Sequence, residues 1–347
     1  MIQSILLEYD LRGNDIGVQP FGNGLIHKTW KIEHAGNEYI LQRINDDIFR
    51  NPAAIASNIS LISRYLKNCH PHYHFVSPMC TVAGAEMVYK EGMGYFRMFP
   101  FVSGSHSKDV VQNPEQAFEA AVQFGRFTRS LSGINIDELN ITIPDFHNLD
   151  LRYTQFLQAI STGNKVRVES AAALVQCLMD EKNIVDEFNG IIQNKAFKLR
   201  VTHHDTKISN ILFDEEEKGI CVIDLDTVMP GFIFSDIGDM MRTYLSPVSE
   251  EERDFSKIMI RKDIYAAIVK GYYSELKNEL SDEEKQSFFF SGKFMIYMQA
   301  LRFLTDYLND DLYYGATYPE QNVVRAGNQY VLLQMLLEQE AKLTVVL

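Results

Sequence analysis

The segment from residue 201 to 226, VTHHDTKISNILFDEEEKGICVIDLD, constrains the fold of this chain more than any other part of the sequence. Two apolar stretches, within 208–213 and 220–223, stand on either side of the acidic, turn-like run DEEEKG. Short apolar stretches separated by a turn are typical of a β-hairpin. The sequence therefore predicts that the chain enters a strand within 208–213, turns, and returns along a second strand that ends at Asp224.

Polar residues at the start and end of this hairpin have the chemistry of a phosphoryl-transfer site. His203, Asp205 and Asn210 follow the pattern H-x-D-x-x-x-x-N. Such a site needs a carboxylate that orients and deprotonates the attacking hydroxyl, which suits Asp205, and oxygen ligands for magnesium, which suit Asn210 and Asp224. Lys207 can neutralise charge that builds on the transferred group, and His203 is expected to support the loop. The pattern alone also arises by chance, but the hairpin and the acid that follows it favour the functional interpretation.

This segment resembles the aminoglycoside phosphotransferase and choline kinase group, whose mark is the same loop followed by an I-D-hydrophobic-acid segment. Within that group the chain is most similar to the N-acetylhexosamine 1-kinases. The resemblance runs from near the start of the chain almost to its end. The blocks that carry it are FGNGLIHKTW (21–30), YILQRIN (39–45), HHDTKISN (203–210), IDLDTVMPG (223–231), SDIGDMMR (235–242) and LRFLTDYLNDDLYY (301–314).

The resemblance implies an α+β, bilobal, protein-kinase-like fold. Residues 1–102 would form a small antiparallel-sheet N-lobe that binds the nucleotide and ends in a hinge. Residues 103–347 would form a larger, mainly helical C-lobe with the catalytic loop, the metal site and the acceptor pocket. Apolar residues at three- and four-residue spacing predict helices there, namely at 116–131, 166–188, 258–276, 283–308 and 322–342.

The N-lobe should carry the devices that bind ATP. Gly22 and Gly24 lie at a turn between strand-like runs and are expected to bring the backbone close to the phosphates. Kinases of this shape carry a lysine on the third strand, and here YILQRIN places Gln42 or Arg43 at that position. Alternation along a strand makes the two residues face opposite sides. We assign the phosphate contact to Arg43.

A second hairpin, at 87–89 and 95–102, leads into the predicted hinge. Adenine would stack between apolar side chains there and bond to the backbone around Phe99, Phe101 and Val102. Pro100 has no N–H, so a neighbouring residue must donate.

Resemblance, and not spacing, assigns the acceptor pocket. In the sugar kinases an Arg and a Tyr eleven residues later contribute to that pocket, and they correspond here to Arg302 and Tyr313. The alternative is an Arg at a helix end that pairs with a nearby acid, Asp306 or Asp310. Asp226 is a candidate for a second metal ligand or for binding a substrate hydroxyl, and a structural role is an equal alternative.

Two further acids, Asp236 and Asp239, are expected to cap the next helix and brace the catalytic loop.

Composition narrows the class of partner. A formal net charge of −13 argues against nucleic acid or an anionic membrane as a partner. The N-terminal run lacks a basic, apolar leader pattern, and no apolar run approaches about 18 residues. Four cysteines lie far apart without a C-x-x-C pair, which argues against a disulfide framework or a thiolate zinc site. We therefore expect a soluble cytoplasmic enzyme with a small-molecule sugar substrate.

The resemblance implies phosphorylation of the anomeric hydroxyl of an N-acetylhexosamine (GlcNAc or GalNAc), with ATP and Mg²⁺ as cofactors. Two alternatives stay open. One is the same chemistry on choline, homoserine or an aminoglycoside, and the other is a nucleotide-binding scaffold without catalysis, suggested by the missing strand lysine. The intact set of Asp205, Asn210 and Asp224 argues against the scaffold. The preference between gluco and galacto epimers depends on pocket geometry that the sequence does not encode.

Overall fold

The computed structural model of this chain describes residues 2–13, 15–22 and 26–344. The chain divides into two compact units, each assembled from separate segments. The first unit consists of Met1–His106, Ser130–Pro144 and Leu212–Pro230, and the second consists of Ser107–Arg129, Asp145–Ile211 and Gly231–Leu347. The lobe boundary predicted at residue 102 stays a prediction.

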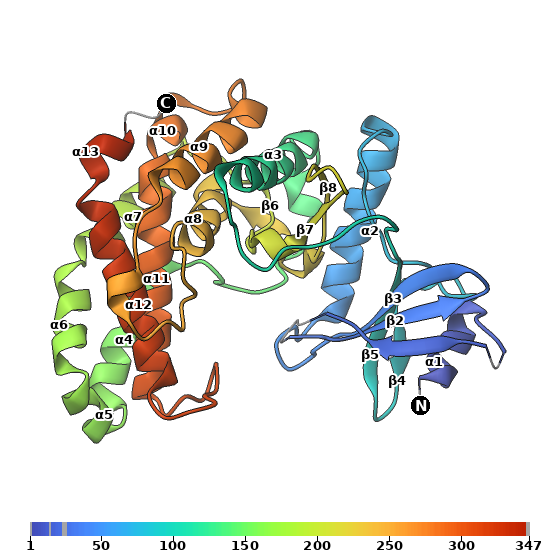
Figure 1. The fold of residues 1–347 in the computed structure, drawn as a ribbon, viewed down its shortest axis with the longest axis horizontal. Helices are drawn as coiled ribbons and strands as arrows, with labels where there is room; N and C mark the ends of the chain where they lie inside the picture. The colour runs from blue at the N-terminus through green and yellow to red at the C-terminus, as the bar shows by residue number, and fades with distance from the viewer. Residues whose placement is uncertain (1, 14, 23–25, 345–347) are drawn as a thin grey trace. The chain divides into compact units, whose positions relative to one another are not determined.

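An antiparallel sheet dominates the first unit, with its strands in the order β1-β2-β3-β5-β4 (Figure 1). Ala35 and Gly36 join β2 to β3 with φ angles of 51° and 79°, as a two-residue hairpin turn requires. The hairpin predicted at 87–102 is present with slightly different ends. The strands are β1 (Gly17–Pro20), β2 (Lys28–His34), β3 (Asn37–Arg43), β4 (Val88–Lys90) and β5 (Gly94–Pro100).

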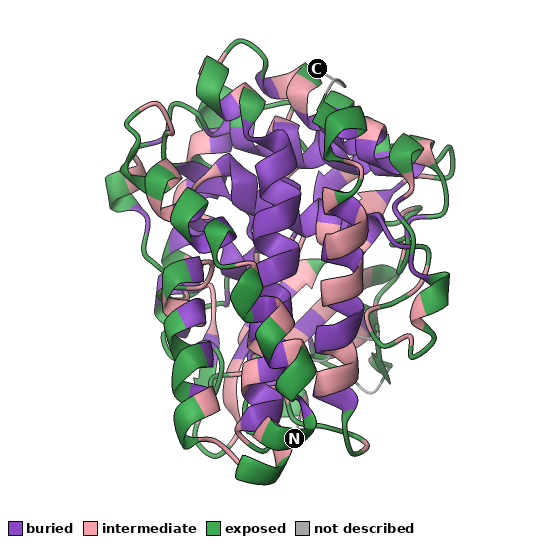
Figure 2. Ribbon diagram, turned by 90° about the vertical axis from the view of Figure 1, so that its left-hand side faces the viewer, coloured by how far each residue is buried: buried purple, intermediate pink, exposed green. Residues whose placement is uncertain are grey.

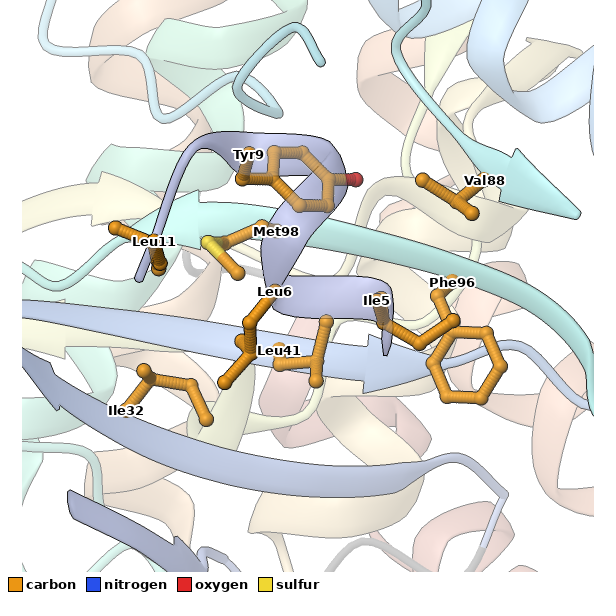
Figure 3. Packing of buried hydrophobic residues seen from close by; sticks show 9 residues of the cluster. All are labelled: Ile5, Leu6, Tyr9, Leu11, Ile32, Leu41, Val88, Phe96 and Met98. Carbon is orange, nitrogen blue, oxygen red and sulfur yellow. The ribbon is translucent and has the colours of Figure 1, made fainter. Parts of the chain in front are cut away.

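One face of this sheet is covered by the N-terminal helices α1 (Gln3–Leu6) and η1 (Leu7–Tyr9). Apolar side chains from the sheet and from these helices form a single buried cluster, shown in Figure 3: Ile5, Leu6, Tyr9, Leu11, Ile32, Leu41, Val88, Phe96 and Met98. Since side chains alternate along a strand, residues 42 and 97, next to Leu41 and between Phe96 and Met98, face the other side of the sheet.

Helix α2 (Pro52–Cys69) begins at Asn51, whose side chain accepts a hydrogen bond from the backbone N–H of Ala54. Asn58, which is 1% exposed, fastens this helix to two other segments of the first unit. Its Nδ2 donates to the carbonyl oxygens of Asn140 and Val228, at 2.9 and 3.0 Å, and its Oδ1 accepts from the N–H of Asn140 at 2.8 Å. Helix α2 contains no acidic residue, and its bonds to these two segments come from the side-chain amide of Asn58.

The hairpin that the sequence predicted is confirmed as β7 (Ile211–Phe213) paired with β8 (Gly219–Val222). The expectation that the strand begins as early as residue 208 is corrected, because residues 208–210 form a 3₁₀ turn, η3 (Ile208–Asn210). That turn lets the chain change direction between the catalytic loop and the strand. After β8 follow η4 (Leu225–Thr227) and β9 (Met229–Gly231). The first unit also contains η2 (Ile136–Glu138).

The second unit is mainly helical, and α11 (Phe288–Leu308) runs through its centre (Figure 1). Most of α11 is buried (Figure 2) because α4, α8 and α12 pack around it. The other elements of this unit are α3 (Pro114–Ser130), α4 (Leu149–Thr162), α5 (Lys165–Ser170), α6 (Ala172–Asp180), α7 (Asn183–Gln193), β6 (Arg200–Thr202), α8 (Ile233–Tyr244), η5 (Phe255–Lys257), α9 (Lys262–Leu276), α10 (Asp282–Gln286), α12 (Gln321–Leu337) and α13 (Glu340–Leu343).

Three long helices predicted from periodicity are divided in the structure. The expected helix at 166–188 is three helices, α5 to α7. The expected helix at 283–308 divides at Ser287 into α10 and α11, and the one at 322–342 divides after residue 337 into α12 and α13. Each division needs only one or two residues off helical geometry, so the apolar spacing continues across it and hides the break. Helix α4 was not predicted. Within the described ranges, no helix is both long and apolar enough to cross a bilayer.

Candidate active site

The second unit carries the catalytic loop, and its central feature is an ion pair two residues apart. Asp205 Oδ1 lies 3.0 Å from Lys207 Nζ, and the two side chains are 18% and 47% exposed. Burial alone would raise the pKa of Asp205, but the positive charge and hydrogen bond of Lys207 outweigh it and lower that pKa. The charge of Asp205 in turn raises the pKa of Lys207. Both groups are therefore ionised at neutral pH.

Asn210 belongs to the same local arrangement. Its Nδ2 donates to the backbone carbonyl of Asp205 at 2.8 Å. His203 lies beneath the loop, fully buried, with its Nδ1 accepting the N–H of Asp205 at 3.3 Å. The ring centre of His203 lies 5.2 and 6.2 Å from those of Phe124 and Phe127, in edge-to-face contacts. The expected supporting role of His203 is confirmed.

Helix α8 holds the loop through two buried acids. Asp236 accepts the backbone N–H groups of His203 and His204 at 3.1 and 2.8 Å. Asp239 accepts the N–H of Thr206 at 2.8 Å. The predicted bracing role is confirmed. The predicted capping role is wrong, because the N-cap of this helix is Phe232, which makes no side-chain cap bond.

Both bracing acids, Asp236 and Asp239, are buried away from water. Burial raises the pKa of Asp236 to about 6 and also raises that of Asp239. Asp239 is neutralised by Arg242, whose Nε and Nη2 lie 3.1 and 3.0 Å from its Oδ1. His204 has a φ of 66°, a conformation uncommon for a residue with a side chain. Such strain persists only where neighbouring bonds fix the backbone, as Asp236 does here.

In the first unit, the second strand of the hairpin ends at Val222, earlier than predicted, and Asp224 lies two residues later as the N-cap of η4, with a φ of 59°. Two residues later, Asp226 is 1% exposed and lies between two cationic or hydrogen-bonding partners. Its Oδ1 is 2.5 Å from Arg97 Nη1, and its Oδ2 is 2.8 Å from His27 Nε2. Burial would raise the pKa of Asp226, but the charge of Arg97 and the bond to His27 lower it to about 2. This placement supports the structural role that the sequence left open.

His27 lies close to both Asp224 and Asp226. Possible ligand atoms of His27, Asp224 and Asp226 lie within 4.8 Å of one another. However, His27 Nδ1 accepts the N–H of Asn45 at 3.1 Å, so in a neutral ring the proton is on Nε2, which donates to Asp226. His27 also stacks on Phe49 at 5.4 Å. We therefore interpret His27 as a brace for Asp226, and not as a metal ligand.

The third strand places Gln42 and Arg43 on opposite faces of the sheet. Gln42 is paired with Arg97 across β3 and β5, and its Oε1 accepts from Arg97 Nε and Nη2 at 3.1 and 3.0 Å. Arg43 shares the face of Leu41, and a Cβ on Gly94 would lie 3.4 Å from its Nε. Arg97, and not Arg43, is therefore the cation of this sheet that pairs with Asp226. The phosphate contact assigned to Arg43 stays a prediction, and this geometry does not favour it.

The predicted nucleotide contacts are only partly described. Gly22 has a φ of 76° with open space where a Cβ would lie, whereas Gly24 lies outside the described residues. Next to Gly22, Phe21 meets Phe101 edge to face at 5.9 Å. The N–H of Phe101 already donates to Glu38 O at 3.1 Å. Val102 therefore becomes the better candidate for the adenine donor.

The two residues assigned to the acceptor lie together in the second unit. Arg302 Nη2 donates to Tyr313 Oη at 3.3 Å. The alternative, in which this Arg pairs with Asp306 or Asp310, is not found among the described residues. Asp306 instead accepts the N–H groups of Tyr313 and Tyr314, at 2.7 and 2.9 Å.

Comparison with known proteins shows the family and the fold of this chain. Residues 17–256 match the model of the phosphotransferase enzyme family, which is more than half of the chain. The chain belongs to this family. The phosphotransferase expected from the catalytic loop is thereby confirmed at the level of the family, while the sugar acceptor is not tested by this match.

Solved structures of other phosphotransferases share the fold over nearly their whole length. An aminoglycoside phosphotransferase from Alicyclobacillus acidocaldarius has a TM-score of 0.64 at 15% identity, covering 98% of this chain and 96% of its own. A microcompartment-associated aminopropanol kinase has 0.64 at 15%, covering 99% and 98%. An amicoumacin kinase in complex with AMP-PNP and Ca²⁺ has 0.63 at 13%, covering 96% and 92%. The α+β, protein-kinase-like fold is thus confirmed.

In this phosphotransferase, sequence reasoning missed two residues that shape the site, Arg97 and His27. Arg97 stands in YFRMFP, and an arginine within an apolar strand is a signal of a buried ion pair. His27 lies inside a block that carried the family likeness, but nothing local marks its partner, Asp226, which is 199 positions away.

Proposed function

We propose that this protein is an ATP- and Mg²⁺-dependent kinase that phosphorylates the anomeric hydroxyl of an N-acetylhexosamine, yielding the sugar 1-phosphate and ADP. The observation that carries the reaction type is the braced loop on which Asp205, Lys207 and Asn210 lie together. The family match supports phosphoryl transfer. The nucleotide analogue and Ca²⁺ bound by the amicoumacin kinase support a nucleotide and a divalent cation as cofactors.

In this proposal Asp205 orients the sugar hydroxyl and accepts its proton as the bond to phosphorus forms. Its lowered pKa keeps it ionised, so it can accept that hydrogen bond at neutral pH. Lys207, already beside the carboxylate, stabilises the negative charge of the transferred group.

The residues proposed for the metal suit magnesium chemically. Mg²⁺ prefers oxygen ligands such as carboxylates, and Asp224 supplies one. The Nδ2 of Asn210 is occupied by the carbonyl of Asp205, so its amide oxygen is the atom that would bind the ion. When bound, the ion neutralises charge on the nucleotide phosphates.

For the nucleotide, we propose adenine between apolar side chains around Phe99, Phe101 and Val102, with the backbone at Gly22 close to the phosphates. The contact of Arg43 with the nucleotide phosphates stays a proposal. Arg97 is the alternative cation for that contact, and the strand geometry favours it.

For the acceptor, the support is the proximity of Arg302 and Tyr313, the pair that the resemblance assigns to the sugar pocket. An arginine donates to sugar hydroxyls or to an acetamido carbonyl, and a tyrosine offers a stacking face with a polar tip. Asp226 was a further candidate for the substrate, but its burial between Arg97 and His27 favours a positioning role.

The test is ADP release by the purified protein with ATP and Mg²⁺ and one acceptor at a time: N-acetylglucosamine, N-acetylgalactosamine, glucose, galactose, choline, homoserine or kanamycin. Asp205→Asn should lower turnover by about two to four orders of magnitude and leave nucleotide binding largely intact. Asp186→Asn is the matched control, because the Asp186 side chain is 63% exposed and forms a surface ion pair with Lys182.

The outcomes separate the alternatives. Release with an N-acetylhexosamine that is lost in Asp205→Asn establishes the sugar kinase. Release only with choline, homoserine or kanamycin keeps the mechanism and replaces the substrate. ATP binding without release for any acceptor, or equal turnover in Asp205→Asn, contradicts the proposal.

A further inference from the structure

A pocket of about 520 Å³ lies within the second unit, between α4 and the C-terminal end of α11. Arg152 from α4 and Arg302 from α11 contribute to its lining, together with Tyr313 from the segment after α11. Two acids, Asp306 and Asp310, also line it. The charges of the two arginines and the two acids determine which ligand the pocket can hold.

The two arginines have no carboxylate partner among the described residues. Arg152 Nη1 donates to Gln155 Oε1 at 3.0 Å and its Nη2 to the carbonyl of Asp145 at 2.8 Å. Its Nε is buried and makes no hydrogen bond within the described residues. Arg302 donates to the side-chain oxygens of Gln299 and Tyr313, both at 3.3 Å. A buried donor without an acceptor is costly to a folded protein.

The acids of the pocket are occupied elsewhere. Besides the two backbone N–H groups that it accepts, Asp306 takes a bond from Asn322 Nδ2 at 3.1 Å. Asp310 accepts Asn164 Nδ2 at 2.8 Å and lies 3.4 Å from Arg167 Nε. Neither acid forms an ion pair with Arg152 or Arg302; Asp306 accepts bonds from neutral donors, and Asp310 pairs with Arg167. The pocket therefore offers a ligand two guanidiniums that no described carboxylate contacts directly.

The side-chain rings around Arg302 add no negative charge and hold its guanidinium in place. His147 is held neutral, since burial and then the charges of His204 and Arg302 lower its pKa. The guanidinium of Arg302 lies 5.4 to 5.7 Å from the ring centres of Phe146, Tyr313 and Tyr314, contacts that hold it in place.

We propose that this pocket is an acceptor subsite in which Arg152 and Arg302 bind a carbonyl or carboxylate oxygen of the acceptor and reject an ammonium group. The role as an acceptor subsite rests on the proposed function. An ammonium would meet two guanidiniums that have no ion-pair partner in the described part of the chain, and juxtaposed like charges disfavour binding. An acetamido or carboxylate oxygen would instead accept hydrogen bonds from these guanidiniums. Arg152 is the specificity residue that this inference adds.

The test compares three derivatives of glucose, each changed at one carbon: N-acetylglucosamine and glucosamine at C2, and glucuronate at C6. Binding is measured by calorimetry on the full chain without ATP, at about pH 6.5, where the amine is protonated. We expect N-acetylglucosamine or glucuronate to bind at least about tenfold more tightly than glucosamine, and the one that does identifies the oxygen. Arg152→Gln should narrow that ratio. Arg152→Lys should keep the rejection of glucosamine but weaken the preferred sugar, because the charge stays and the planar fork is lost.

Arg126→Gln is the matched control, since it removes a guanidinium from the same unit whose charge is neutralised by Glu275, and it should leave the ratio unchanged. If Arg152→Gln unfolds, Arg302→Gln replaces it. Equal binding of glucosamine, a ratio unchanged in both variants, or binding of none of the three sugars overturns the inference. ADP release is measured separately: selective binding without ADP release refutes the sugar kinase and leaves the subsite standing.

Discussion

Replacing Asp226 by Asn should destabilise the first unit strongly, because it leaves the buried guanidinium of Arg97 without its counterion. The two side chains are 1% and 3% exposed and 2.5 Å apart. Removing one partner of such a pair typically costs about 3–5 kcal/mol. The pKa of Asp226 gives an independent scale: its fall from 3.8 to about 2 corresponds to about 2 kcal/mol in favour of the ionised folded state. We expect a loss of about 3 kcal/mol.

Trp30 provides the assay. It is the only tryptophan of the chain and packs against the core of the first unit, so its fluorescence during urea unfolding follows that unit. The set is Asp226→Asn, Arg97→Met and the double variant. Asp10→Asn is the matched control in the same unit, because Asp10 and Arg12 form an ion pair with side chains 68% and 72% exposed. Exposed pairs contribute little.

The double variant tests the pairing itself. If the two groups stabilise each other, the double variant should lose less than the sum of the single variants by at least about 1 kcal/mol. Additive effects, or a loss below about 1 kcal/mol in Asp226→Asn, would refute the reasoning. The pH dependence has a defined sign, since the folded pKa lies below the unfolded one. The contribution of Asp226 is fully present above about pH 4 and is lost as the pH falls through about 2.

Three further changes test the braces of the site. Gly231→Ala would place a Cβ 2.4 Å from Thr202 Oγ1 and His204 Cε1, so we expect about 1–3 kcal/mol less stability by thermal unfolding and slower ADP release; an unchanged variant would mean that the loop yields easily. The pKa of Asp236 is raised to about 6, so its contribution to stability is present below about pH 4 and lost as the pH rises through about 6, by about 3 kcal/mol. The urea midpoint of the unchanged protein should fall as the pH rises through about 6, and that of Asp236→Asn should not. Parallel pH profiles of the two proteins would contradict this assignment. Asn58→Ala removes four hydrogen bonds of a buried side chain and should cost about 2–3 kcal/mol by Trp30 fluorescence; a smaller loss than that of Asp10→Asn would argue against the tether.

Local sequence predicted the elements whose partners are close along the chain. The hairpin of β7 and β8 needs only two apolar runs and a turn, and the pattern around Asp205 contains its own partner, Lys207, two residues later. The sheet of the first unit was predicted for the same reason. Where local spacing was the only guide, it also failed, as at Ser287, where an apolar periodicity continues across a break between two helices.

The amino-acid sequence by itself determined the phosphotransferase family and, through the resemblance that it carries, the α+β fold, because both can be recognised from residue types at short, fixed spacing. Only the tertiary structure decided which side chains face each other: Gln42 meets Arg97 from 55 positions away, Asp226 meets His27 from 199 positions away, and Arg152 comes to share a pocket with Arg302. The reason is physical. Strand register and helix packing are set by the burial of the whole core, and a charge finds its partner only after those larger surfaces have been placed.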